Sequence, residues 1–153
     1  MGRSSRVVAA SILSAALLWS GIAAAKFNIS MGSLSADGQE VRNLSCSLDG
    51  GGLFAAVAVV GALAKQKSGL DACAPQGAAF TVQFTFAGGG AKEAKVLAST
   101  AKGKEACVSH ALTRIRTDLS GQCTAVVLVG NAEAARKAAD TLAPADAKDS
   151  EKK

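Results

Sequence analysis

The fold is decided by residues 78–100, which read AAFTVQFTFAGGGAKEAKVLAST. From Ala79 to Phe86 apolar and polar residues alternate with period two, as they do in a strand that buries one face. The three glycines at 88–90 predict a turn, and the alternation that resumes from Glu93 to Ala98 predicts a partner strand. We therefore expect an antiparallel hairpin whose phenylalanine-rich face packs into a core.

The polar face of the first strand of this hairpin is the candidate contact surface of the protein. An antiparallel sheet commonly buries one face and leaves the other in water. The polar side chains that alternate with the apolar ones are Thr81, Gln83 and Thr85. We expect these three side chains either to meet a partner or to form an uncovered polar face.

The segments around the hairpin predict two further strands and two helices. Residues 42–48 alternate like a half-buried strand, and 124–129 form a nearly continuous apolar run, which indicates burial on both faces or at a sheet centre. Residues 53–67 are apolar and rich in alanine, and 102–115 repeat apolar residues at helical spacing. The order predicts an α+β fold, a two-layer sandwich with ferredoxin-like βαββαβ order, an antiparallel sheet and both helices on one face.

Two weaker patterns extend this domain at its ends. Lys26 to Ser35 alternates briefly before the turn signal Asp37-Gly38, which predicts an extra N-terminal strand. Asn131 precedes an alanine-rich stretch that runs to Leu142 and is suited to cap a short helix there. The charged tail after Pro144 has too few apolar residues to join a core, so we expect it to be disordered.

The first 25 residues have the order of a secretory signal. Arg3 and Arg6 give a basic start, Val7 to Ala25 is apolar or small, and three alanines precede Lys26. We expect cleavage after Ala25 and export to the periplasm or the extracellular space, with no stable membrane insertion afterwards; the alternative is a retained anchor. The chain then divides into a signal peptide, a single α+β domain and a short helix with a charged tail, at 1–25, 26–130 and 131–153.

Four cysteines, Cys46, Cys73, Cys107 and Cys123, remain after such a cleavage. An even number of cysteines in a small exported domain predicts disulfides, and their wide spacing does not fit a zinc site. In the expected topology the end of the first strand lies beside the start of the last, and the end of the first helix lies near the start of the second. We therefore expect Cys46 to pair with Cys123 and Cys73 with Cys107, because the other pairings would span opposite ends of the layer.

The charge and the aromatic content argue against a nucleic-acid partner. Seventeen basic and 12 acidic residues give a net charge of +5, and loss of Arg3 and Arg6 leaves 15 against 12, or +3. The charges are interspersed, so no basic patch is indicated. Trp19 lies in the signal and the chain has no tyrosine, so a stacking platform for bases or sugars is not expected.

The motifs that suggest chemistry do not form a constellation. Gly50, Gly52 and Ala55 satisfy G-x-G-x-x-A, and Asp71 follows about twenty residues later, but a glycine turn into a packed helix explains them better. His110 is the one histidine and has no second histidine with which to bind a metal. We expect no catalytic, cofactor or metal site.

Residues 70–115 resemble the C-terminal domains of the TonB and AgmX/PglI type, which are modules of the Gram-negative cell envelope. Members of the AgmX type have a helix cysteine before a hairpin and a second cysteine in the helix that follows, placed similarly to Cys73 and Cys107. The matching residues are Leu70, Cys73, Gly77, Phe80 to Phe86, the glycines at 88–90, Val96, Ser99, Thr100, Cys107, Val108, Leu112 and Ile115. It implies a periplasmic protein-binding module, one that accepts a partner strand at a sheet edge.

Two classes of function follow from these observations. The first is a non-enzymatic exported domain that binds an envelope protein or has a structural role. The alternative is a small secreted enzyme or inhibitor whose site is assembled from loops. An exposed, unpaired strand edge favours the first class, and a pocket that collects His110 with a carboxylate favours the second.

Overall fold

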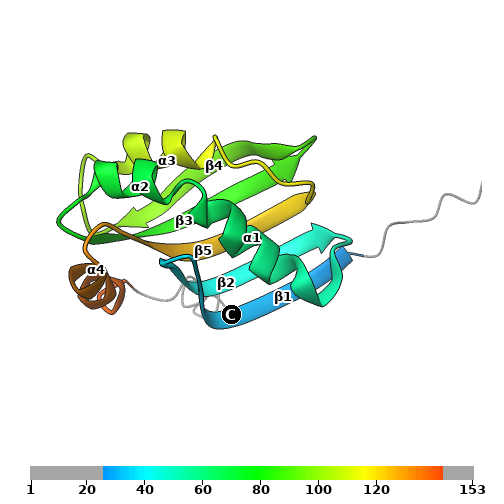
Figure 1. The fold of residues 1–153 in the computed structure, drawn as a ribbon, viewed down its shortest axis with the longest axis horizontal. Coiled ribbons are helices and arrows are strands. Elements are labelled where there is room, and N and C mark those ends of the chain that lie inside the picture. The colour runs from blue at the N-terminus through cyan, green and yellow to red at the C-terminus, as the bar shows by residue number, and fades with distance from the viewer. Residues whose placement is uncertain (1–25, 143–153) are drawn as a thin grey trace, which may run out of the picture.

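The structure is a computed structural model that describes residues 26–142. Its five described strands form one antiparallel sheet in the order β1-β2-β5-β3-β4 (Figure 1). The strands are β1 Lys26–Ala36, β2 Gln39–Asp49, β3 Ala78–Ala87, β4 Gly90–Ser99 and β5 Gly121–Val129. The expected signal at 1–25 and the tail after residue 142 lie outside the described residues.

Helices cover both faces of this sheet, but unequally. Three of the four described α-helices lie on one face: α1 Ala55–Ala64, which follows the short 3-10 helix Gly52–Phe54, α2 Lys67–Cys73 and α3 Glu105–Leu112. The alternation of β3 sends Phe80, Val82, Phe84 and Phe86 into the core beneath them. The fourth helix, α4 Ala132–Ala139, packs on the opposite face against Ala79, Val126 and Leu128.

The α+β class and the antiparallel sheet are confirmed, whereas the ferredoxin-like order is not. That order would put the last strand at a sheet edge beside β2, but β5 lies between β2 and β3. The side chains of β5 explain its central place. Val127 and Val129 join the core under α1, α2 and α3, while Val126 and Leu128 join the cluster under α4, so the strand is buried on both faces as its apolar run predicts.

The first predicted helix continues further than its sequence indicates. In place of one helix over 53–67, α1 is followed after Lys65 and Gln66 by α2, which runs through Gly69. Leu70 and Cys73 are both buried, so tertiary contacts hold α2 in place although glycine disfavours a helix by about 1 kcal/mol. The second helix, α3, is shorter than 102–115 at both ends: it begins only at Glu105, and residues 113–115 lie outside it although Ile115 stays buried in the core.

Two disulfides tie these layers together. Cys46 is bonded to Cys123 with a Cα separation of 4.0 Å, and Cys73 to Cys107 with a Cα separation of 5.7 Å. The first bond joins directly paired residues of β2 and β5, and the second joins the end of α2 to α3. These are the two pairs that the sequence predicts.

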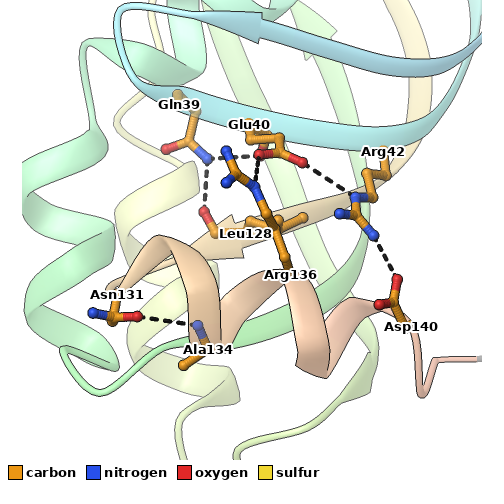
Figure 2. A network of polar contacts seen from close by, with 8 residues as sticks. All are labelled: Gln39, Glu40, Arg42, Leu128, Asn131, Ala134, Arg136 and Asp140. Atoms are coloured by element: carbon orange, nitrogen blue, oxygen red, sulfur yellow. Dashed lines mark hydrogen bonds and ion pairs between the residues drawn. The ribbon is translucent and has the colours of Figure 1, made fainter.

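Side-chain hydrogen bonds and ion pairs fix α4 to the turn end of β2 (Figure 2). Asn131 caps α4, as its sequence predicts, by accepting a hydrogen bond from the Ala134 amide at 3.0 Å. The Glu40 carboxylate lies between two guanidinium groups, 3.2 Å from Arg42 Nε and 2.7 Å from Arg136 Nε. Arg42 Nη1 in turn lies 2.7 Å from a carboxylate oxygen of Asp140, at the end of α4.

This cluster predicts a stability that falls with acid. Burial raises the pKa of the Glu40 carboxyl, but hydrogen bonds and charges from Arg136 and Arg42 outweigh it and leave the pKa below its ordinary value of 4.5. A lowered folded-state pKa stabilises the protein above the unfolded-state pKa, and that contribution is lost as the pH falls through the folded-state value. We expect Glu40→Gln to lower the melting temperature by about 2–4 °C at pH 7.

Thermal unfolding followed by circular dichroism at pH 7 and pH 3 tests this expectation. The difference in melting temperature between the variant and the unchanged protein should be smaller at pH 3 than at pH 7. Glu133→Gln is the matched control, because the ion pair of Glu133 with Lys137 lies in solvent with both side chains more than three-quarters exposed. An equal fall in melting temperature in both variants would contradict the prediction that the ion pairs of Glu40 stabilise the fold more than an exposed pair does.

Candidate partner-binding surface

The predicted contact residues of β3 differ from one another in exposure. Thr81 is only 4% exposed, and its hydroxyl oxygen has no hydrogen-bond partner among the described residues. It lies between Val126 of β5 and Ala98 of β4, at the end of the sheet that α4 covers. This corrects the expectation of a wet face at Thr81. Gln83 and Thr85 are half-buried and lie further along β3, outside the part of the sheet that α4 covers.

Gln83 and Thr85 belong to two polar rows that cross the whole sheet. The strand pairing brings one residue of each of the five strands into each row, on the face opposite α1, α2 and α3. In the sheet order β1, β2, β5, β3, β4, the first row is Ser30, Ser45, Thr124, Gln83 and Lys95. The second row, in the same order, is Asn28, Ser47, Gln122, Thr85 and Glu93. We call these ten residues the polar sheet face, and each of them is exposed or half-buried.

The polar sheet face offers hydrogen bonds and little charge. Eight of its ten side chains are hydroxyls or amides, and the two charged residues both lie on β4. A shallow hollow of about 320 Å³ lies at its β1 end, lined by residues that include Asn28, Ser30 and Thr124. Uncharged polar side chains suit a flat contact that is built on hydrogen bonds.

The two edges of the sheet differ in their charge. The outer edge of β1 pairs with no strand among residues 26–142, and Phe27 to Ala36 contains neither a charged residue nor a proline. The other edge strand, β4, carries exposed Lys92, Glu93 and Lys95 and has two register shifts against β3. Charges and bulges are devices that keep a sheet edge from pairing with another chain, so β4 is protected and β1 is not.

An apolar groove lies beside the unprotected edge. Phe27, Ile29 and Met31 of β1, with Phe54 and Val57 at the start of the helical layer, line a cavity of about 540 Å³. Phe54 is 78% exposed and Val57 is 52% exposed, although large apolar side chains are rarely left in water next to one another. We call this cavity the β1 groove.

The residues with possible chemistry are dispersed over the fold. His110 is exposed on α3, and Asp71 accepts a hydrogen bond from the Gly130 amide and pairs with Lys67. The glycines at 50–52 form the turn that leads to α1, at the end of the helical layer far from α2 (Figure 1). Across residues 26–142, no group of three or more histidine, cysteine, aspartate or glutamate side chains is placed to hold a metal ion.

Protein-family models, curated proteins and solved structures contain no match to this chain. Residues 70–115, for which the sequence predicts a resemblance to the TonB and AgmX/PglI type, cover part of α2 and all of β3, β4 and α3. In the sheet, β2 and β5 separate β3 and β4 from β1. In the part of the chain that the structure describes, no helix has the length and apolar character needed to span a bilayer.

One feature of the sequence, the lack of charged residues along β1 after Lys26, indicates the unprotected edge. The alternation of Phe27, Ile29 and Met31 predicts a strand, but the absence of charge between Lys26 and Asp37 is what distinguishes an edge open to pairing. The groove itself could not be predicted. Phe54 and Val57 lie in an apolar stretch whose pattern indicates burial, and only the position of α1 over β1 and β2 shows that they face outwards.

Proposed function

We propose that this chain is an exported, non-enzymatic domain that binds a protein partner in the periplasm or outside the cell, by adding a strand to the edge of β1. The observation that carries the proposal is the uncharged, unpaired edge of β1 beside the β1 groove. Two disulfides support export, because such bonds persist in oxidising compartments.

Strand addition at β1 uses two features of the edge together. Backbone amide and carbonyl groups along an edge strand give affinity to an incoming extended segment without regard to its side chains. Because side chains alternate across a strand, every second side chain of that segment would enter the β1 groove beside Phe54 and Val57. The intervening side chains would extend the polar sheet face next to Asn28 and Ser30. The partner is therefore a segment of alternating apolar and polar residues.

A pair of matched substitutions tests this proposal. Met31 and Leu97 are exposed apolar residues on opposite edge strands, 37% and 48% exposed. We expect Met31→Lys to abolish recovery of a specific partner from envelope extract, because a lysine beside the groove opposes strand pairing and would bury a charge. We expect Leu97→Lys to leave recovery unchanged.

The measurement is an affinity capture with the full exported chain, followed by quantitative mass spectrometry of the proteins recovered by each variant. Circular dichroism shows that both variants are folded to the same extent. A partner that binds the Met31→Lys and unchanged proteins equally would place binding elsewhere on the domain and refute the role of β1.

A further inference from the structure

The sequence of β1 has the same pattern when read from either end. From its start, Phe27, Asn28, Ile29 and Ser30 alternate apolar with polar residues, and from its end Ala36, Ser35, Leu34 and Ser33 do the same. Met31 and Gly32 lie at the centre. Ile29, Leu34 and Ala36 all pack against the core under the helices, so apolar residues from both halves of the strand lie on the same face of the sheet.

The charges at the two ends of β1 are opposite in sign. Lys26 begins the strand and Asp37 follows its last residue, and both side chains are exposed. An antiparallel neighbour with the same sequence would place its Asp37 beside Lys26 and its Lys26 beside Asp37. Two equivalent ion pairs would thus close the ends of an uncharged interface.

From this symmetry we infer that the strand which fills the β1 edge comes from a second copy of the chain, an inference that rests on the proposed function. The two β1 strands pair in antiparallel fashion about a two-fold axis that passes through the region of Met31 and Gly32. An axis perpendicular to the sheet keeps both helical layers on one side, so the two β1 grooves become continuous and cover Phe54 of each copy.

This arrangement also follows from what each copy offers. The groove needs a segment of alternating apolar and polar residues that carries no charge, and Phe27 to Ala36 is such a segment. The same surface then serves both copies, as a two-fold interface requires. The result is one antiparallel sheet that runs through both molecules and ends on each side at β4, the edge that Lys92, Glu93 and Lys95 protect.

Sedimentation equilibrium of the full exported chain, with its disulfides intact, tests the inference. We expect a dimer at micromolar concentration, a monomer for Met31→Lys and a dimer for Leu97→Lys. A monomeric unchanged protein across the concentration range would overturn the inference, yet capture of another protein through β1 would leave the proposed function standing. A dimer that persists in Met31→Lys would also overturn it.

A charge series tests the antiparallel arrangement. We expect Lys26→Asp to weaken the dimer by about tenfold or more, because each attraction between the ends of β1 becomes a repulsion. Adding Asp37→Asn to that variant should restore part of the loss, and asparagine tolerates the left-handed backbone of this turn position. Equal dissociation constants throughout the series would exclude antiparallel pairing of the two β1 strands.

Discussion

Replacing Cys46 and Cys123 together with alanine is expected to lower the free energy of unfolding by about 4.5 kcal/mol. This bond links residues 77 positions apart, so its removal frees a long segment of the unfolded chain. Both cysteines are also buried between β2 and β5, and the shorter alanine side chains would leave that site less well filled. Small domains are stable by about 5–15 kcal/mol, so the variant should be close to unfolding at room temperature.

Removal of the other disulfide provides the comparison. Cys73 and Cys107 lie 34 positions apart, for which the same entropy argument gives about 3.8 kcal/mol, and Cys107 is exposed. Urea unfolding followed by circular dichroism, with midpoint and slope fitted for each double variant, measures both losses. The decisive result is which double variant loses more free energy of unfolding. A larger loss from Cys73→Ala/Cys107→Ala would show that loop length and burial do not set the contribution of these bonds.

The disulfide pairing could be predicted although the strand order could not. Pairing of Cys46 with Cys123 requires only that β2 and β5 be antiparallel neighbours, which holds both in the ferredoxin-like order and in the observed one. Pairing of Cys73 with Cys107 requires only that the two helices lie side by side. The two orders differ in whether β5 lies outside β2 or between β2 and β3. Both disulfides are compatible with either order, so the cysteines do not distinguish them.

A signal for the correct order was nevertheless present in β5. The apolar run from Val126 to Val129 predicts a strand buried on both faces, which an edge strand is not, but the ferredoxin-like order assigned from the succession of elements requires an edge. Helix α4, which supplies the second covering layer, lies outside the bounds 26–130 that the sequence predicts for the domain. Its packing on Val126 and Leu128 also explains why Thr81 is buried and does not belong to the open surface.

Contacts between segments far apart in the sequence account for what could not be predicted at the candidate site. The polar sheet face combines residues of all five strands, and its rows exist only because the registers of four strand pairs coincide. Similarly, the β1 groove depends on where α1 crosses β1, which no local pattern determines. Local alternation therefore predicts which way each side chain points, whereas the order and register of the strands decide which side chains meet.

Gly121→Ala is expected to destabilise the domain by about 4 kcal/mol, because β2 leaves no room for a side chain at the start of β5. A Cβ atom there would lie 2.2 Å from the carbonyl oxygen of Ser47 and 2.8 Å from Cα of Leu48, both backbone atoms of β2. The φ angle of Gly121 is +129°, which residues with a side chain rarely adopt. A movement of β2 could relieve this clash, but the nearby Cys46–Cys123 disulfide and the burial of Leu48 oppose such a movement.

Gly61→Ala is the matched control and should shift stability in the opposite direction. Gly61 lies inside α1, and a Cβ atom added there would meet no side chain or neighbouring element within 4 Å. Alanine favours a helix over glycine by about 0.5–1 kcal/mol, so this variant should be slightly more stable than the unchanged protein. Urea midpoints of the two variants test both expectations. If Gly121→Ala unfolded at the same urea concentration as Gly61→Ala, β5 could not approach β2 as closely as their pairing at Leu48 and Gly121 requires.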